Sequence, residues 1–427
     1  MRPSPGVRFD ESCATPGQYT DVLCVVFPTP AMLFAVSDSN SFWDVQSRLA
    51  TFVMCLAMFS GSVGLLAALT PMVTRLPSKQ PKREWSTLHI CLVTKGVNRQ
   101  VVLRSVEEMR HLHRLHPRVR FVVLTEEGRD FDPGRLGVDV VFVPQKYQPP
   151  KARFKARSLE YFREHELHCD DDWVLHLDEE TGVDEHSIRA CIEFIERTPY
   201  RIGQGIILYN SVNYWEQAVL TLAEIIRFRE DLGRFNLQHG TLRQSIWGVH
   251  GSFLLLSAKL ENEITWDTTT SAEDFWFSHI ALGRGYRSGF IPSAAREQSP
   301  WTVMDFLRQR RRWSCGIWLV GLHGKLVVLT SMLPSLELPI MLMCCFGWVV
   351  LPSWVAIWAQ CYYASGIFSV MFATLISDLD AGVSALGMIW HTTASPLLAV
   401  PVQLLQTAAN VLSIVKPTND FYIVEKQ

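Results

Sequence analysis

The fold class follows from residues 173–181, WVLHLDEET, where an apolar strand ends in three consecutive acids. In α/β proteins, ligands collect at the carboxyl ends of parallel strands, so acids at this position face a crevice. The period-2 alternation of a strand places Asp178 and Glu180 on one rim, with Glu179 pointing the other way. Two carboxylates on one edge attract a hard divalent cation, which also binds phosphate oxygens. The ordinary alternative is a solvated acidic turn.

Other apolar runs on both sides of this strand indicate a sheet. Those preceding it are residues 88–94, LHICLVT, residues 120–125, RFVVLT, and residues 138–144, VDVVFVP. Helical spacing of Val102, Val106 and Met109 separates the first two runs. A further helix at residues 153–166 leads into the acidic strand. This alternation of strand and helix predicts a doubly wound parallel sheet.

Long uncharged segments flank the predicted sheet. Residues 50–70 contain no charged side chain and are long enough to cross a bilayer. Residues 354–376 and 381–415 are likewise free of Asp, Glu, Lys and Arg. The 427-residue chain, 48% hydrophobic, is therefore expected to be an integral membrane protein with a soluble middle.

The charges around the first span predict which side of the membrane the middle domain occupies. Five basic residues follow that span, namely Arg75, Lys79, Lys82, Arg83 and Lys95. By the positive-inside rule, they place the middle domain in the cytosol. Residues 1–49 would then be extracytoplasmic, and the apolar run within them at 22–36 is interpreted as an interfacial or re-entrant segment.

Composition and charge argue against several classes of partner and site. The net charge of −2 and the lack of a basic face with interleaved aromatics argue against a nucleic-acid partner. The ten cysteines include no CxxC pair, so neither a structural zinc site nor a disulfide framework is indicated.

The chain divides accordingly. A linker at 71–87 leads to a catalytic domain at 88–302, and residues 326–416 are expected to hold two, three or more membrane helices before a tail at 417–427. Between them, residues 303–325 predict a basic amphipathic helix on the cytoplasmic membrane surface. Its Arg308, Arg310 and Arg311 are expected to meet lipid head groups rather than substrate.

Two further motifs carry candidate chemistry. Glu273 and Asp274 directly precede an apolar helical run at 275–282, where the helix dipole favours carboxylates. The surface helix contains Gln309, Arg312 and Trp313 in a Gln-x-x-Arg-Trp pattern.

In this order, the motifs resemble those of family-2 inverting glycosyltransferases, which have the nucleotide-sugar-binding GT-A fold. A narrower resemblance, to Egghead-type β-1,4-mannosyltransferases, covers about residues 88–325. It is carried by Val143-Pro144, Tyr147, Phe154-Lys155-Ala156-Arg157, residues 176–181, Gly203-Gln204-Gly205, Gly251-Ser252, Ala272-Glu273-Asp274, Glu297-Gln298-Ser299-Pro300, Asp305-Phe306-Leu307 and the closing Phe421-Tyr422-Ile423-Val424. The resemblance implies a GT-A type mixed sheet inserted between transmembrane helices.

The resemblance also implies site roles. Asp274 is the expected catalytic base, and Asp178 and Glu180 are the expected ligands of Mg²⁺ or Mn²⁺. The remaining assignments place Thr94, Glu126, Lys155, Arg157, Asp178 and Arg312 at the nucleotide-sugar donor, and Glu273, Gln309 and Trp313 at the acceptor. For Lys155 and Arg157 the alternative is a solvated helix surface, and for Trp313 an interfacial anchor.

The expected activity is transfer of mannose from GDP-mannose to a lipid-linked acceptor such as glucosylceramide, in glycosphingolipid biosynthesis. The expected location is the endoplasmic reticulum or Golgi membrane in a eukaryote, and otherwise the plasma membrane. One alternative is a processive polysaccharide synthase using a UDP- or GDP-sugar. Another is a non-catalytic membrane scaffold with the same fold.

Overall fold

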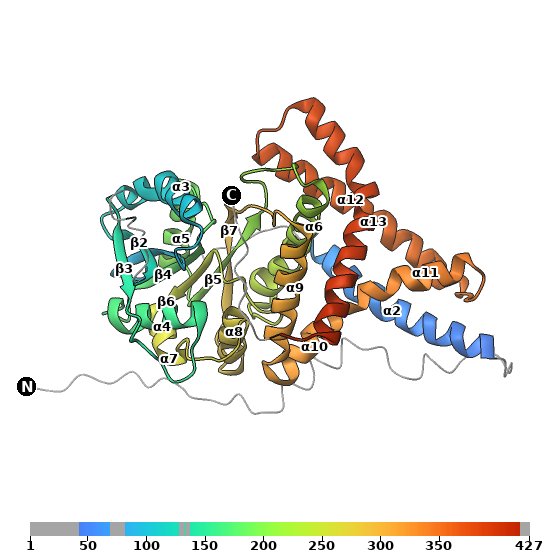
Figure 1. Cartoon of the computed structure of the whole chain (residues 1–427), viewed down its shortest axis with the longest axis horizontal. Helices are drawn as coiled ribbons and strands as arrows, with labels where there is room; N and C mark the ends of the chain where they lie inside the picture. The colour runs from blue at the N-terminus through green and yellow to red at the C-terminus, as the bar shows by residue number, and fades with distance from the viewer. Residues whose placement is uncertain (1–41, 69–81, 128–132, 134–136, 419–427) are drawn as a thin grey trace, which may run out of the picture.

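The computed structural model describes residues 42–68, 82–127, 133 and 137–418 (Figure 1). Most of the predicted N-terminal segment 1–49, much of the linker 71–87 and nearly all of the tail 417–427 lie outside these residues, as does the closing motif at 421–424.

A seven-stranded sheet forms the centre of the α/β part. Its strands are β1 (Leu88–Val93), β2 (Val119–Glu126), β3 (Asp139–Val143), β4 (Trp173–Asp178), β5 (Ile202–Leu208), β6 (Leu254–Ser257) and β7 (Ser288–Arg296). Their order is β3-β2-β1-β4-β6-β5-β7. Only β6 runs antiparallel to its neighbours β4 and β5, and the other pairs are parallel. The predicted α/β class with a mixed sheet is confirmed.

Helices cover both faces of this sheet, which explains the unbroken apolar strands. On one face α3 (Arg99–Met109) and α5 (Glu185–Arg197) pack on alternate residues such as Ile90 and Leu175. On the other face α4 (Phe154–Glu166), α7 (Ala258–Ile264) and α8 (Glu273–Gly283) pack on the intervening residues, including Cys91 and Val174. All six β1 residues are buried. The five β4 residues that precede Asp178 are buried as well, so the strand that carries Asp178 is held in a closed core.

A second part of the molecule is helical. It contains α2 (Phe42–Ala68), α6 (Ala218–Phe235), the π-helical segment η4 (Asn236–Leu242), α9 (Val303–Trp318), α10 (Gly321–Met332), η5 (Leu333–Leu336), α11 (Glu337–Cys345), α12 (Ser353–Asp380) and α13 (Ala385–Val415). The predicted surface helix begins at residue 303 as expected, capped by the Thr302 hydroxyl, which accepts from the Asp305 N–H at 3.1 Å. It ends at Trp318, because Gly321, with a φ of 72°, turns the chain into α10.

The helical part contains stretches with the length and apolar composition of membrane spans. Within the described residues, three stretches meet this criterion: Gly321–Cys345, Ser353–Asp380 and Ala385–Val415. Helix α2 covers most of the first predicted span, residues 50–70, and ends at Ala68. These long apolar helices suggest membrane association, while the crossing and its direction stay predictions.

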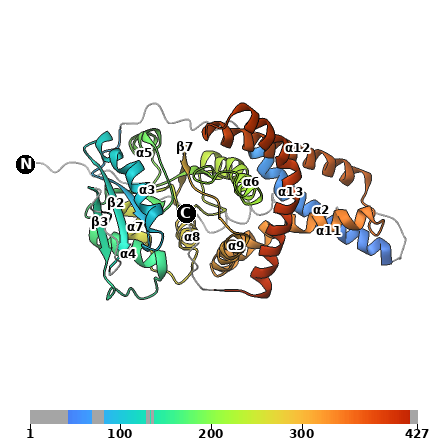
Figure 2. The same ribbon diagram turned by 45° about the horizontal axis from the view of Figure 1, so that its top comes forward.

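The helices of this part pack around two separate hydrophobic clusters. Helix α2 packs with α11 and the first half of α12 through residues such as Met58, Ile340 and Val355, and in Figures 1 and 2 α2 and α11 project away from the sheet. Helix α13 lies along α6 and α9, and α2 also contacts α6. The second half of α12 also joins this group, where Val370 and Val402 share a core with α6.

One arginine joins the two parts of the molecule. The guanidinium of Arg296, the last residue of β7, donates to both carboxylate oxygens of Asp380 at the end of α12, at 2.7 and 2.8 Å. It also donates at 3.0 Å to Asp184, which caps α5. A bidentate arginine–carboxylate pair fixes orientation as well as distance. The end of α12 is thus held against the sheet.

Candidate active site

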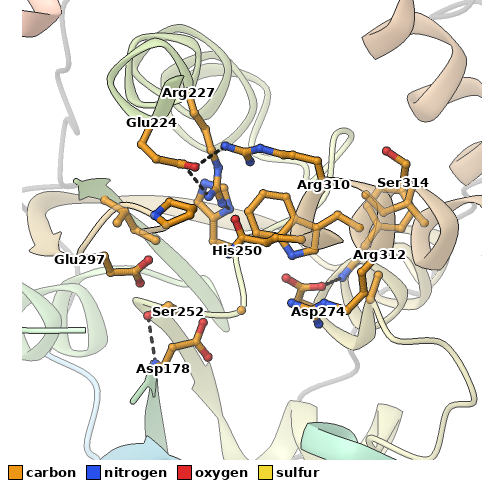
Figure 3. Close-up of a pocket in the computed structure, with 18 of the residues that line it drawn as sticks. Asp178, Glu224, Arg227, His250, Ser252, Asp274, Glu297, Arg310, Arg312 and Ser314 are labelled. Atoms are coloured by element: carbon orange, nitrogen blue, oxygen red, sulfur yellow. Dashed lines mark hydrogen bonds and ion pairs between the residues drawn. The ribbon is translucent and has the colours of Figure 1, made fainter. Parts of the chain in front are cut away.

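A cavity of about 470 Å³ lies between the carboxyl edge of the sheet and helices α6, α9 and α13 (Figure 3). Its lining includes ten residues singled out from the sequence: Thr94, Glu126, Lys155, Asp178, Glu180, Glu273, Asp274, Gln309, Arg312 and Trp313. Residues from four separate predicted motifs therefore meet at one place. Their roles at the donor and acceptor stay predictions, but their grouping is a property of the fold.

The turn after β4 is held by two residues next to other strands, Ser252 just before β6 and Glu297 just after β7. The backbone N–H of Asp178 donates to the hydroxyl of Ser252 at 3.2 Å. The hydroxyl of Thr181 lies 2.6 Å from the same oxygen and donates at 2.6 Å to the carboxylate of Glu297, just after β7. These bonds leave the turn little freedom, so Asp178 is presented to the cavity from a fixed backbone.

Glu179 follows β4, which ends at Asp178, and it also lines the cavity. Its buried carboxylate accepts hydrogen bonds at 2.5 Å from both the Thr94 hydroxyl and the Asn98 amide. Burial, followed by the charge of Glu180, raises the pKa of Glu179 to about 7. Glu179 therefore joins the end of β4 to the end of β1, and the Thr94 hydroxyl is committed to that contact.

Lys155, near the start of α4, brings the acids together. Its ammonium donates to the carboxylate of Asp178 and, at 3.0 Å, to the carbonyl of Gly251, and it lies 4.0 Å from Glu273. A Cβ on Gly251 would lie 3.1 Å from the carboxylate of Asp274 and 3.2 Å from the Lys155 nitrogen. Burial alone would lower the pKa of Lys155, but the charges of Asp178 and Glu273 outweigh it and raise the pKa.

Arg157 does not line the cavity. Its guanidinium donates to the carbonyls of Tyr147 at 2.9 Å and Pro144 at 2.5 Å, and it lies 3.6 Å from Glu126. These bonds hold the segment that follows β3. We therefore expect any effect of Arg157 on a bound donor to act through Glu126, which does line the cavity.

The predicted acid pair begins α8. The carboxylate of Asp274 accepts from the Phe275 N–H at 2.7 Å. Glu273 is buried, and burial followed by the charge of Asp274 raises its pKa to about 7. Opposite them is Arg312 of α9, whose pKa is lowered by burial and raised by Glu273, then by Asp178 and Asp274. One guanidinium therefore interacts electrostatically with both acidic motifs.

A glycine sets the distance between α8 and α9. The carbonyl of Gly316 accepts the Thr270 hydroxyl at 2.7 Å. A Cβ at this position would lie 2.9 Å from the backbone nitrogen of Ala272, closer than real Cβ contacts. Sequence reasoning missed this residue, because a glycine inside a helix shows its role only when the partner helix is known.

The other face of α9 is packed with arginines. The guanidinium carbons of Arg227 and Arg310 lie 4.4 and 4.5 Å from the Trp313 ring centroid, within cation–π range. Arg310 also forms a 2.5 Å ion pair with Glu224 of α6, and both side chains are buried. The expectation that Arg310 meets lipid head groups is therefore wrong, because α6 supplies a buried carboxylate that sequence analysis did not pair with it.

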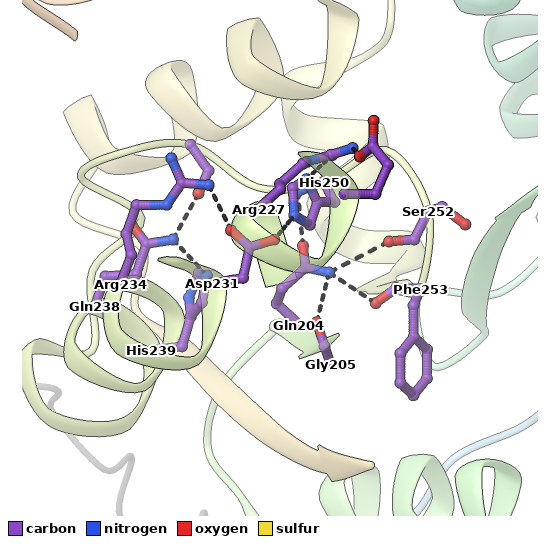
Figure 4. A network of polar contacts seen from close by, with 12 residues as sticks. Gln204, Gly205, Arg227, Asp231, Arg234, Gln238, His239, His250, Ser252 and Phe253 are labelled. Atoms are coloured by element: carbon purple, nitrogen blue, oxygen red, sulfur yellow. Dashed lines mark hydrogen bonds and ion pairs between the residues drawn. The ribbon is translucent and has the colours of Figure 1, made fainter. Parts of the chain in front are cut away.

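A buried polar network supports the loop that forms the cavity floor (Figure 4). The amide nitrogen of Gln204 donates to the carbonyls of Gly205, Ser252 and Phe253 at 3.1 to 3.3 Å, and its oxygen accepts from the His250 N–H at 2.9 Å. The His250 ring in turn contacts Asp231 at 2.6 Å. Sequence analysis did not identify this network, since its members are far apart in the chain.

Some polar atoms at the cavity lack partners. The Tyr209 hydroxyl and the amide oxygens of Gln298 and Gln309 are buried and have no hydrogen-bond partner among the described residues. All three residues line the cavity. Because buried polar atoms are normally paired, these atoms are suited to a ligand rich in hydroxyl groups.

The residues fit a divalent cation only if a ligand completes its coordination. No group of three or more His, Cys, Asp or Glu side chains arranged to hold a metal occurs in the described part of the chain. Asp178 and Glu180 supply the carboxylate oxygens that Mg²⁺ and Mn²⁺ prefer. Further ligands would come from water or from phosphate oxygens, as in sites where a metal is bound together with a nucleotide.

The family described as "Glycosyl transferase family group 2" matches residues 173–377, which begin with the acidic strand. This part of the chain is similar to the family-2 glycosyltransferases. Curated relatives include β-1,4-mannosyltransferases. That of Caenorhabditis elegans is 32% identical over 240 residues, covering 54% of this chain and 50% of the relative. That of Drosophila melanogaster is 34% identical over 221 residues, covering 50% and 46%.

The chain thus spans about half the length of these curated relatives. Among solved structures, a mannosyltransferase from Pyrobaculum calidifontis in complex with GDP-Man and Mn²⁺ aligns with 86% of this chain and 98% of its own, at 11% identity and a TM-score of 0.48.

Proposed function

We propose that this chain is a membrane-bound, inverting β-1,4-mannosyltransferase that uses GDP-mannose and a glucosylceramide-like glycolipid. The observation that carries the proposal is the single cavity in which Asp178, Glu180 and Asp274 meet Lys155 and Arg312, next to long apolar helices. The similarity to β-1,4-mannosyltransferases supports the choice of sugar and linkage.

In the proposed reaction, Asp274 is the general base. Its carboxylate takes the proton of an acceptor hydroxyl as that oxygen attacks the anomeric carbon of mannose. The bond from this carbon to the donor diphosphate breaks, so the electron pair leaves with GDP and the configuration inverts. A carboxylate on the first turn of a helix is held in position by the backbone, here through the Phe275 N–H.

The proposed reaction also requires that the leaving diphosphate be stabilised. Lys155 and Arg312 are the cations placed to meet the charge that develops there. Mg²⁺ or Mn²⁺, bound by Asp178 and Glu180, would neutralise part of the same charge. Because Lys155 contacts Asp178 directly, we expect donor binding to rearrange this pair.

The acceptor is proposed to contact Glu273, Gln309 and Trp313. With a pKa of about 7, Glu273 is largely protonated in mildly acidic solution and can donate a hydrogen bond beside the base. The unpaired amide oxygen of Gln309 can accept one from a sugar hydroxyl.

The proposed setting is a cytosolic catalytic domain on the endoplasmic reticulum or Golgi membrane of a eukaryotic cell, or on the plasma membrane of another. The three long apolar stretches support membrane association. The basic residues that follow α2 support the cytosolic side.

A donor and acceptor screen tests the proposal. Full-length protein in detergent would be given GDP-mannose, UDP-glucose or UDP-N-acetylglucosamine with Mn²⁺ and glucosylceramide. We expect a single mannose to be transferred from GDP-mannose only, and the linkage analysis to show a β-1,4 bond. Transfer from a UDP-sugar alone would refute the mannosyl assignment. Extended polymer formed without lipid acceptor would instead indicate a polysaccharide synthase.

A further inference from the structure

Two buried side chains of the cavity carry polar atoms without a partner. The Tyr209 hydroxyl and the amide oxygen of Gln298 have no hydrogen-bond partner among the described residues, and these two residues are only 3% and 6% exposed. Both line the cavity that also holds Asp274. A phenol hydroxyl and a side-chain amide each offer a donor and an acceptor, which is what a sugar hydroxyl needs. The two side chains are therefore suited to a neutral ligand with several hydroxyl groups.

The backbone around these two residues is fixed by the sheet. Strands β5 and β7 are parallel neighbours. Their pairing continues past the strand ends, because the Glu297 N–H donates to the Leu208 carbonyl at 2.8 Å and the Glu297 carbonyl accepts from the Ser211 N–H at 3.1 Å. Tyr209 and Gln298 are therefore held near each other at one edge of the sheet.

A cation connects the Tyr209 ring to Trp313, one of the predicted acceptor residues. The guanidinium carbon of Arg227 lies 5.2 Å from the Tyr209 ring centroid and 4.4 Å from that of Trp313. Arg227 also donates to the His250 ring at 3.0 Å, and the other ring nitrogen of His250 contacts Asp231 at 2.6 Å. The position of the Tyr209 ring is thus defined by contacts that do not involve its hydroxyl.

The strand order separates these residues from the predicted donor residues. Thr94, Glu126 and Asp178 lie at or next to the ends of β1, β2 and β4, whereas Tyr209 and Gln298 follow β5 and β7. Strand β5 is two strands beyond β4 in the sheet, or about 10 Å at the usual strand spacing. A nucleotide bound over β1, β2 and β4 therefore leaves Tyr209 and Gln298 to another ligand.

The predicted base lies between these two groups of residues. Gly251 comes shortly before β6, and a Cβ on it would lie 3.1 Å from the carboxylate of Asp274. Strand β6 is placed between β4 and β5. An acceptor hydroxyl at Asp274 therefore leaves the rest of its sugar ring about one strand spacing from Tyr209.

Resting on the proposed function, we propose that Tyr209 and Gln298 are specificity-determining residues that bind hydroxyl groups of the acceptor sugar. In a 1,4-linked product of a glucosyl acceptor the attacked oxygen is O4, so the hydroxyls at C2, C3 and C6 are the ones available to these residues. A diphosphate would need a cation without a partner, and the cation at this place, Arg227, is paired with Glu224 at 3.5 Å. A lipid chain would leave both polar side chains unpaired.

The test uses full-length protein in a polyoxyethylene detergent, which contains no sugar, with GDP-mannose, Mn²⁺ and octyl glucoside. Tyr209→Phe and Gln298→Leu should each raise the KM for octyl glucoside about three- to tenfold, because each removes a neutral hydrogen bond to the acceptor. The kcat and the KM for GDP-mannose should stay unchanged. The melting temperature of Tyr209→Phe should not fall, since its hydroxyl has no protein partner to lose.

Acceptors that lack one hydroxyl identify the contact. The 2-, 3- and 6-deoxy forms of octyl glucoside are compared, and at least one should raise the KM of the wild type. In the variant that lacks the partner of that hydroxyl, the same deoxy acceptor should cause little further loss, because the two changes remove one interaction. Additive losses with all three deoxy acceptors would overturn the proposal. A raised KM for GDP-mannose in place of the acceptor would also overturn it.

Each variant has a matched control outside the cavity. Tyr161→Phe removes the hydroxyl of a partly buried tyrosine of α4, and Gln360→Leu replaces an exposed glutamine of α12. Both controls should keep the wild-type KM for octyl glucoside. If Tyr209→Phe and Gln298→Leu also keep it, the two residues do not bind the acceptor.

Binding separates this inference from the proposed activity. A fluorescent short-chain glucosylceramide can be titrated against the purified protein without any donor. If the wild type transfers no mannose, the proposed function is refuted, yet weaker binding of the probe by Tyr209→Phe and Gln298→Leu than by the two controls still supports the subsite. Equal binding of the probe by all four variants and the wild type would overturn it.

Discussion

The two walls of the cavity carry similar charges but hold them differently. On the sheet wall, Asp178 pairs with Lys155, and its side chain is 39% exposed. On the helical wall, Glu224 pairs with Arg310, and their side chains are 1% and 9% exposed. When a partly exposed ion pair separates, water can solvate both charges. When a buried ion pair separates, each charge stays buried without a partner. The sheet wall is therefore suited to exchange partners with a ligand, and the helical wall to keep its shape.

Replacing Asp274, the proposed base, tests the sheet wall and has the largest expected effect. Asp274→Asn should lower the transfer rate by about 10²–10⁴-fold, because the amide cannot take the acceptor proton. Circular dichroism and thermal unfolding in detergent should match the wild type. If the variant keeps full transfer activity, Asp274 is not the base.

Breaking the buried pair tests the helical wall. Arg310→Met leaves Glu224 buried without its closest cation and should cost about 3–5 kcal/mol of folding stability. The double variant Glu224→Leu/Arg310→Met should recover most of that loss, because an apolar pair of similar volume needs no solvation. Thermal unfolding of detergent-solubilised protein measures both. A single variant as stable as the wild type would show that the pair does not hold this wall.

The close contact between α8 and α9 can be tested by adding one methyl group at Gly316. Gly316→Ala places a Cβ against the backbone of Ala272 and should cost about 1–3 kcal/mol, with reduced activity because α8 carries Asp274. Gly283→Ala is the control in α8, since its Cβ would meet nothing within 4 Å. The control should be neutral or slightly more stable. Equal melting temperatures for the two variants would contradict the close approach.

The smallest expected effect is a pH dependence of stability. The pKa of Glu273 is about 7 in the folded protein and 4.5 in the reference state, so the folded state holds its proton longer. Its contribution to stability is complete below about pH 4.5 and is lost as the pH rises toward 7. Glu273→Gln removes this loss, so the variant should gain on the wild type between pH 4.5 and 7. Parallel melting curves across this range, without donor or metal, would contradict the burial of a proton on Glu273.

The sheet wall could be predicted from the sequence because its residues follow local patterns. Asp178 ends an apolar strand, and Glu273 and Asp274 open an apolar helix. Strand direction then brings such residues to one edge. The antiparallel direction of β6 could not be predicted, because this strand has only four residues.

The helical wall could not be predicted to the same extent. Arg310 looked like a residue for lipid head groups, because nothing near it in the chain indicates that Glu224 lies opposite. Gln204 and Asp231 are likewise polar residues whose partners come from other segments. Gln403 and Gln406, which line the cavity from α13, were part of an uncharged stretch, and a count of charges does not separate amides from apolar side chains.

The contact of Arg296 with Asp184 and Asp380 has a practical consequence for producing the protein. A fragment that stops after α9 would lose Asp380 and with it two of the three hydrogen bonds of the Arg296 guanidinium. It would also expose the apolar surfaces of α6 and α9 on which α13 packs. The helical C-terminal part therefore forms a wall of the cavity and cannot be removed as a separate unit. Expression trials should keep α12 and α13 and vary the detergent instead.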